Sequence, residues 1–133
     1  MFRELVTANR SYRRFLESET ISRQTLLELI DLARLSPSGA NKQALRYYVS
    51  CDAKQNERVF DALAWAAYFR DWAGPVAGER PSGYIVIVQD QANKMVSGID
   101  YGIAAQTILL GAVEKGLGGC MIGNINKPKL EDA

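Results

Sequence analysis

The stretch that decides the fold is "GIDYGIAAQTILLGAVEKG", residues 98–116. It predicts a long helix from about Gly98 to Lys115. A helix that is apolar on every side has to be buried on every side. In a chain of 133 residues that is difficult without a second subunit, so the pattern favours a homodimer over a central helix of a compact monomer. The apolar residues around this helix are Ile99, Ile103, Ala104, Ile108, Leu109, Leu110 and Val113.

The rest of the chain alternates between helical and strand-like segments. Ser22 is a plausible N-cap for a helix that runs to Leu35, with an apolar stripe at helical spacing. The continuous apolar run 84–89 is typical of a central strand buried on both faces. Mixed α/β or α+β, with helices packed on a sheet, is therefore the expected class. Further helices are expected at 2–8 and 56–72, further strands at 46–50 and 120–123, and a loop at 74–83.

The end of the chain, "NINKPKLEDA" (124–133), resembles the start of another helix. Pro128 stands where this helix would begin, with Glu131 and Asp132 expected in its first turn. A helix that begins and then stops suggests either a fragment of a longer protein or a frayed tail.

Composition excludes several kinds of chemistry. The formal net charge is +1, so nucleic acid and anionic membranes are not expected partners. No segment has the length of a membrane span or the pattern of a signal peptide. The chain has no histidine, which excludes histidine-dependent nucleophiles and metal sites. Cys51 and Cys120 are expected to be free thiols of a cytoplasmic protein, and any reactive group is expected to come from a cofactor.

Three polar or glycine-rich stretches are candidate binding segments. In "NRSYRRF" (9–15) arginines surround a serine, a combination that suits phosphate oxygens but also occurs on solvated surfaces. "SPSGANKQ" (36–43) carries more hydrogen-bonding groups than a loop between a helix and a strand usually needs, although it could also be a capped loop. "GLGGCMIG" (116–123) follows a helix instead of opening one, so it is no dinucleotide-binding glycine loop.

Taken together, these stretches resemble the nitroreductase family of FMN-dependent oxidoreductases. The resemblance rests on the order R-S-x-R, P-S-x-x-N-x-Q, then D-x-G-x-x-x-Q (Asp100, Gly102, Gln106) running into G-L-G. It implies an α+β fold with a mostly antiparallel sheet flanked by helices and a long central helix. It also implies one domain over 1–133 and an intertwined homodimer with two FMN molecules at its interface. Relatives continue with a last strand and a tail, so this chain is expected to be truncated at its C-terminus.

The resemblance also assigns roles to residues. Arg10, Ser11 and Arg13 match the segment that holds the FMN phosphate, ribityl chain and pyrimidine side. A second group matches a loop that reaches the flavin from the partner subunit: Pro37, Ser38, Asn41 and Gln43. A third matches the turn that approaches the cofactor after the long helix: Gly118, Gly119, Ile122 and Gly123. No catalytic side chain and no metal are implied. The chain departs from the pattern at Asn9, where many relatives have arginine, and at Ala44 and Leu45, where Pro-Trp is usual.

The activity implied by the resemblance has two half-reactions at one site. NADH or NADPH would pass hydride to flavin N5, and a nitroaromatic, a quinone or a similar acceptor would then be reduced. Arg13 is the candidate for stabilising the reduced flavin near N1. Two alternatives stay open: a flavin-binding protein or degenerate paralogue without turnover, and a plain interaction domain without a ligand.

Overall fold

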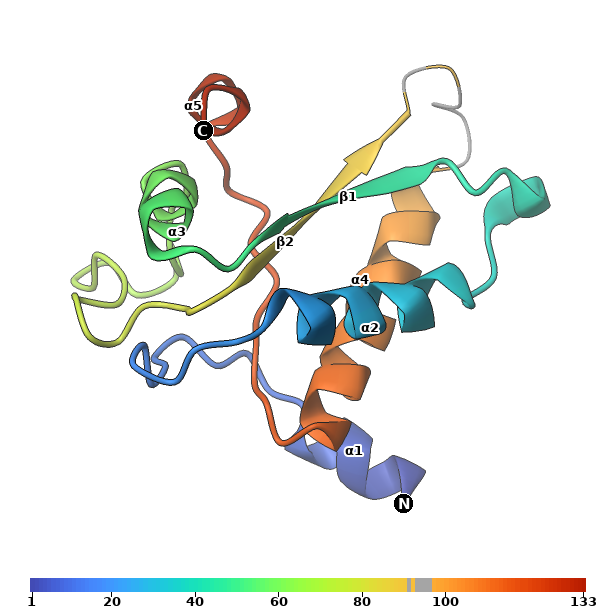
Figure 1. Ribbon diagram of the computed structural model, residues 1–133, viewed down its shortest axis with the longest axis horizontal. Helices are drawn as coiled ribbons and strands as arrows, with labels where there is room; N and C mark the ends of the chain where they lie inside the picture. The colour runs from blue at the N-terminus through green and yellow to red at the C-terminus, as the bar shows by residue number, and fades with distance from the viewer. Residues whose placement is uncertain (91, 93–96) are drawn as a thin grey trace.

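The computed structural model describes residues 1–90, 92 and 97–133. Its elements follow the expected order and give the α+β class (Figure 1). The predicted helices at 2–8, 22–35 and 98–115 and the strands at 46–50 and 84–89 are confirmed within one or two residues. The elements are α1 (Phe2–Ala8), α2 (Arg23–Arg34), the 3₁₀ turn η1 (Gly39–Asn41), β1 (Leu45–Ser50), α3 (Ala53–Phe60), β2 (Tyr84–Gln89), α4 (Ser97–Glu114) and α5 (Lys127–Glu131).

The two strands pair antiparallel, with Leu45 opposite Gln89 and Ser50 opposite Tyr84. Alternate side chains point to one face of this sheet, where α2 and α4 pack. The expected burial of 84–89 on both faces was wrong. Val88, on the other face, is 46% exposed. The side chains packed towards the helices are Leu45, Tyr47, Val49, Ile85 and Ile87.

The core forms where α2 packs against α4. The Ser22 hydroxyl accepts a hydrogen bond from the Thr25 amide at 3.0 Å, so the predicted N-cap of α2 is confirmed. Gly111 lets the two helices approach closely, because a Cβ at this position would collide with Leu32. The buried core residues are Leu26, Leu29 and Ala33 of α2 and Ala104, Ile108 and Ala112 of α4.

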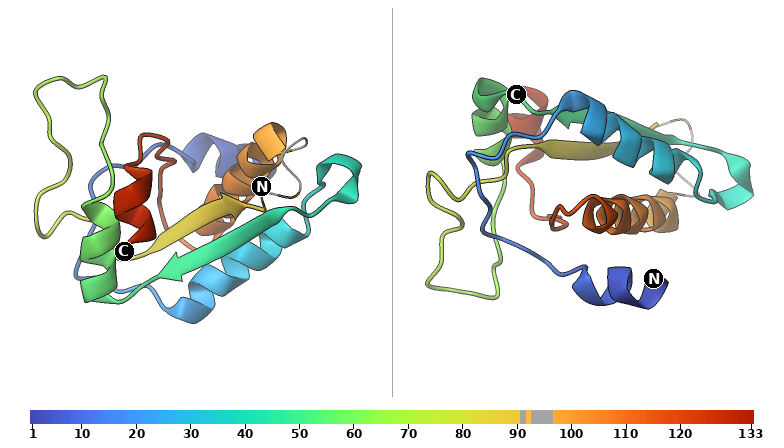
Figure 2. Two further views of the ribbon diagram at one scale, coloured as in Figure 1. Left: turned by 90° about the horizontal axis from the view of Figure 1, so that it is seen from above. Right: turned by 60° about the horizontal axis from the view of Figure 1, so that its bottom comes forward.

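Only part of the apolar surface of α4 is covered within one chain. Figure 2 shows α1 on the side of α4 that faces away from the sheet. Near the start of α4, Ile99 is 75% exposed and Tyr101 is 50% exposed. On α1, Phe2 is 68% exposed and Val6 is 41% exposed. No helix in the described part of the chain is long and apolar enough to cross a membrane.

The expected helix over 56–72 was wrong in both its start and its end. The helix α3 begins at Ala53, with the Asp52 carboxylate as its cap, and it ends at Phe60. Residues 62–64 instead lie extended beside 124–126. The Ala64 amide donates to the Asn124 carbonyl at 3.0 Å, and the Asn126 amide donates to the Ala62 carbonyl at 2.8 Å. The chain then leaves the body of the molecule as a protruding arm over 64–80 (Figure 2).

The base of this arm is held by aromatic packing. Trp65 is 7% exposed, and its ring centroid lies 5.8 Å from that of Phe60. The Arg80 guanidinium also lies over the Phe60 ring, 4.1 Å from its centroid. Gly74 has φ +111°, and a Cβ here would come within 2.9 Å of the indole of Trp65. The helical spacing of apolar residues in 56–72 therefore reflects packing at the base of the arm.

Two expectations for the C-terminal quarter were also wrong. Residues 120–123 form no strand, since the pairing there is limited to single bridges at Gly119 and Ile125. A helix does begin near Pro128, but Asn126 is its cap and its first turn holds no acidic residue. Glu131 is its last residue, and Asp132 is its C-cap.

Candidate functional site

The segment after α1 lies beside the turn that follows α4. Ser11 and Gly119 form a parallel bridge, and the Tyr12 amide donates to the Gly119 carbonyl at 3.1 Å. The absence of side chains at the glycines permits this approach. A Cβ on Gly118 would lie 2.7 Å from the Tyr12 ring, and one on Gly119 would lie 2.7 Å from Leu109. The structure therefore brings two of the predicted binding segments together, although they are far apart in the sequence.

The arginines of this segment present guanidinium groups that are only partly satisfied. Arg10 donates to the carbonyls of Val6 at 3.2 Å and Asn9 at 2.8 Å, and Arg13 donates to the carbonyl of Ser11 at 3.1 Å. Neither guanidinium has a carboxylate partner among the described residues. Since a guanidinium carries five N–H donors, both can still bind an anion.

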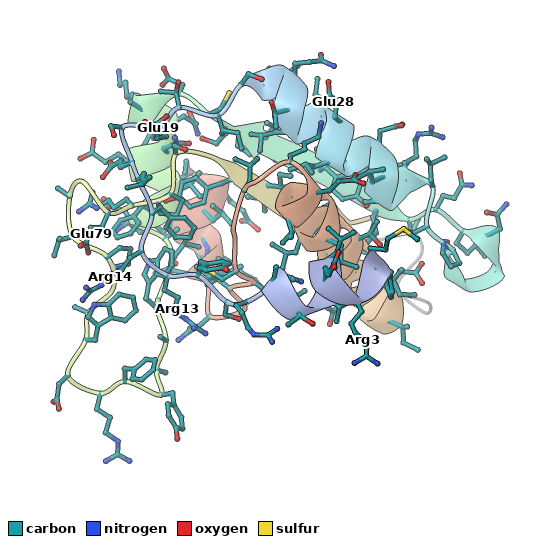
Figure 3. The ribbon with its side chains drawn as sticks, turned by 90° about the horizontal axis from the view of Figure 1, so that it is seen from below. Arg3, Arg13, Arg14, Glu19, Glu28 and Glu79 are labelled. Atoms are coloured by element: carbon teal, nitrogen blue, oxygen red, sulfur yellow. The ribbon has the colours of Figure 1, made fainter. Side chains whose placement is uncertain are left out.

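Arg14, by contrast, is ion-paired with Glu79 of the arm at 3.5 Å. Figure 3 shows Arg14 beside Glu79, with Arg13 close by. Of the three arginines in the predicted cluster, Arg14 is therefore the one with a carboxylate partner among the described residues.

A small hollow of about 230 Å³ opens next to Arg10 and Ser11, between the N-terminal segment and α4. Its polar wall includes the side chains of Asn9 and Gln106, whose amide groups lie 3.5 Å apart. The hollow is lined by Val6, Asn9, Arg10, Ser11, Gln106, Leu109 and Met121.

The loop 36–43 is held in an unusual conformation. Ala40, Asn41 and Gln43 have φ values of +48°, +52° and +49°, which side-chain-bearing residues rarely adopt. The Ser38 hydroxyl accepts from the Gln43 amide at 2.8 Å, and the Gln43 side chain donates to the Asn41 side chain at 2.9 Å. Asn41, Gln43 and Pro37 are exposed, whereas Ser38 is half-buried.

Within one chain, the loop and the arginine segment lie at different parts of α4. The loop contacts Asp100 in the first turn, and the arginine segment contacts Gln106 and the turn after the helix. Six residues separate these two anchors, which is about 9 Å along the axis and about 120° around it. The predicted site residues therefore form two groups, which are anchored at different turns and on different sides of α4.

A model of the nitroreductase family matches residues 6–133. The chain belongs to the nitroreductase family. Comparison with curated proteins gave no match.

Solved structures agree with this membership. A nitroreductase family protein from Clostridium novyi NT is 28% identical with a TM-score of 0.78, over all of this chain and 75% of that one. An FMN-dependent nitroreductase from Clostridium difficile R20291 is 27% identical with a TM-score of 0.71, over 94% of this chain and 61% of that one. A nitroreductase with bound FMN from Desulfitobacterium hafniense DCB-2 shares the fold, at 24% identity and a TM-score of 0.72, over 92% of this chain and 70% of that one.

The last two predicted site residues of this nitroreductase family member lie after the glycine turn. Ile122 is half-buried, and Gly123 is exposed with open space where a Cβ would point. Their neighbour Met121 lines the hollow beside Arg10, and they do not. The structure therefore places Gly118 and Gly119 against the arginine segment, and Ile122 and Gly123 just beyond it.

Sequence reasoning missed a second, wider hollow beside the same segment. It measures about 490 Å³ and lies between Ser11–Arg14 and the arm, where Phe69 and Trp72 form an aromatic wall. These aromatics had been assigned to a helix, so no sequence signal directed them to this place. Sequence reasoning also missed that Leu109 and Met121 line the smaller hollow beside Arg10. Both residue types are as common in a hydrophobic core as in the lining of a binding site.

Cys120 follows the glycine turn and is half-buried. Burial raises the pKa of this thiol, and the nearby Arg13 guanidinium opposes the change. Burial likewise raises the pKa of the Tyr84 hydroxyl. Both groups are therefore neutral near pH 7. The prediction that Cys51 and Cys120 are free thiols is confirmed.

Proposed function

We propose that this chain is the FMN-binding part of an oxidoreductase that takes electrons from NADH or NADPH and reduces a nitroaromatic, a quinone or a similar small acceptor. The observation that carries the proposal is the bridge between Ser11 and Gly119. This bridge holds the segment with Arg10, Ser11 and Arg13 beside the turn that follows α4. The guanidinium groups of Arg10 and Arg13 have no carboxylate partner in the described part of the chain. Two of the similar solved structures are described as FMN-dependent or as having FMN bound.

The groups present fit the two ends of FMN. Guanidinium and hydroxyl donors suit a phosphate, and they line a hollow beside the N-terminal segment. The exposed amides of Asn41 and Gln43 can both donate and accept, as the edge of an isoalloxazine ring requires. Neither amide titrates, so this recognition would not change with pH. The hollow beside Arg10, at about 230 Å³, would hold the phosphate end, with the ring outside it.

In this proposal the protein binds and orients, and the cofactor supplies the redox chemistry. Hydride and electron transfer would be the chemistry that FMN supplies at this site. Arg10 and Ser11 would hold the phosphate. Arg13 would place positive charge near the pyrimidine side, where it stabilises negative charge on the ring. Asn41 and Gln43 would fix the orientation of the ring plane relative to an incoming donor or acceptor.

We further propose a homodimer in which each site takes the loop 36–43 from the partner. Two observations support this arrangement. The loop and the arginine segment are apart in one chain, and apolar side chains of α1 and α4 are exposed. Ile99 at 75% and Phe2 at 68% would be covered by a second copy. A cytoplasmic location remains a prediction.

The first experiment is the visible spectrum of the purified protein. A flavin spectrum supports cofactor binding, and a colourless protein that takes up no FMN refutes it. Oxidation of NADPH and of NADH is then measured with a quinone and with a nitroaromatic. Flavin binding without turnover with any donor and acceptor pair would favour the alternative of a flavin-binding protein.

A mixed dimer tests whether the site is shared. One subunit carries Arg10→Ala, and the other carries Asn41→Ala with Gln43→Ala. In a shared arrangement one site receives both lesions and the other receives none, so about half of the FMN capacity returns relative to the two mutant homodimers. If each chain builds its own site, both sites stay damaged and no capacity returns.

A further inference from the structure

The loop 36–43 needs an anchor outside itself. Three of its side-chain-bearing residues, Ala40, Asn41 and Gln43, have positive φ values. Such conformations persist only where the surroundings impose them. The hydrogen bonds between Ser38, Asn41 and Gln43 close the loop on itself, but they do not fix it relative to the helices. Figure 1 shows η1 at the end of the molecule opposite α3 and α5, beyond the start of β1.

Asp100 in the first turn of α4 supplies such an anchor. Its carboxylate oxygens accept from the Gly39 amide at 3.0 and 3.3 Å. The side chain is 5% exposed, and it has no ion-pair partner in the described part of the chain. Removing a carboxylate from water is costly unless hydrogen bonds compensate, and the Gly39 amide supplies such a hydrogen bond. Two turns along α4, the Thr107 hydroxyl lies 3.0 Å from the hydroxyl of Ser36.

The same helix also contacts the other half of the proposed site. Gln106 lies 3.5 Å from the Asn9 amide nitrogen, next to Arg10. Buried residues of α2 and α4 pack against each other and hold this helix in the core. A residue that bonds the loop to α4 therefore determines the position of the Asn41 and Gln43 side-chain amides relative to the rest of the proposed dimer.

We infer that Asp100 is a positioning residue, which holds the loop 36–43 in the conformation that presents Asn41 and Gln43 to the flavin ring. The inference rests on the proposed function and goes beyond it. Asp100 would not touch the cofactor. It would act only through the Gly39 amide.

The test compares two replacements at one position. Asp100→Asn keeps an oxygen acceptor for the Gly39 amide, whereas Asp100→Leu has a similar size and no acceptor. We expect Asp100→Leu to weaken FMN binding by roughly tenfold or more, because the binding-competent loop becomes a minor state. Asp100→Asn should restore most of this affinity. If Asp100→Leu does not fold, Gly39→Pro removes the donor instead, at a position that follows an extended Ser38 and begins a 3₁₀ turn.

Two readouts separate positioning from a general loss of stability. The first is riboflavin, which lacks the phosphate. Asp100→Leu should weaken the binding of riboflavin and of FMN by the same factor, whereas Arg10→Ala should weaken the binding of FMN alone. The second needs no flavin. Amide hydrogen exchange at Gly39 and Gln43 should accelerate in Asp100→Leu, while exchange in the core of α2 stays as in the parent. Glu114→Leu is the matched control for loss of a carboxylate on the same helix, because this exposed side chain lies at the other end of α4 from the loop.

The outcomes differ for the two levels of the proposal. If the parent binds FMN and Asp100→Leu binds it equally well, the positioning role is wrong and the proposed function stands. An Asn variant as weak as the Leu variant would also overturn it, because the acceptor would then not be what matters. A parent that binds neither FMN nor riboflavin would overturn the proposed function and the inference together.

Discussion

Replacing Arg10 or Arg13 by alanine should weaken FMN binding, while the same replacement at Arg14 should not. The three positions are close in sequence, and each replacement removes one positive charge. They differ in what the guanidinium already binds. Arg14 is paired with Glu79 at 3.5 Å, whereas Arg10 and Arg13 bond only to backbone carbonyls among the described residues. Arg14→Ala is therefore a matched control for the loss of charge.

The size of the effect follows from exposure. Hydrogen bonds to charged groups contribute about 1.5–3 kcal/mol. Arg10 is exposed, so we expect the lower end, which corresponds to roughly a tenfold loss of affinity. Arg13 is half-buried, and its contribution should lie nearer the upper end, between roughly thirtyfold and a hundredfold. Because exposed charges are screened by salt, all titrations need the same ionic strength.

The assay is a fluorescence titration of FMN with each variant, accompanied by thermal unfolding. Arg10→Ala also removes two bonds to the carbonyls of Val6 and Asn9, so a normal unfolding transition is needed before an affinity is interpreted. The reasoning is refuted if the Arg10 and Arg13 variants both bind FMN like the parent. It is also refuted if Arg14→Ala loses as much as they do, since the effect would then reflect overall charge.

Three further predictions concern packing and protonation. Gly111→Ala should lower the free energy of unfolding by about 1–3 kcal/mol, because its Cβ would collide with Leu32. Gly102→Ala on the same helix has nothing within 4 Å of the added Cβ and should be neutral or stabilising. Equal losses of stability for the two variants in urea unfolding would contradict this account. Ile99→Glu should convert a dimer to a monomer in sedimentation without loss of helicity, since Ile99 is 75% exposed in the single chain, and a parent that is already monomeric at micromolar concentration would refute the dimer. Burial raises the pKa of the Cys120 thiol, so the folded state keeps this proton to a higher pH than the unfolded state does. The free energy of unfolding should therefore fall as pH rises above about 8.5. Cys120→Ala should flatten this part of the plot of stability against pH, and an unchanged slope would count against burial of the thiol.

Local signals in the sequence were enough to predict α2 and β1. In α2 a capping serine precedes apolar residues at helical spacing, and these determine one buried face wherever the helix lies. In β1 aromatic and β-branched residues suit a half-buried pleated surface. The order of the three candidate binding segments was likewise visible in the sequence, because groups that suit a phosphate and a ring edge can be recognised as residue types.

The end of α3 could not be predicted in this way. Residues 61–72 have helical spacing, but backbone bonds to 124–126 compete with the helix, and their partners lie about sixty residues away in the sequence. The arm and its aromatic wall at Phe69 and Trp72 were missed for the same reason.

The sequence by itself determined which residues could bind a ligand, since hydrogen-bonding capacity and charge belong to the side chains. Only the tertiary structure decided which of them meet. The bridge from Ser11 to Gly119 joins two segments that lie about a hundred residues apart in the sequence. The positive φ values at Ala40 and Asn41 could not be predicted, because neither residue is a glycine. Contacts between distant segments depend on how the other elements pack around α4. The long apolar pattern of α4 predicts that this helix is buried, but it does not specify which segments bury it.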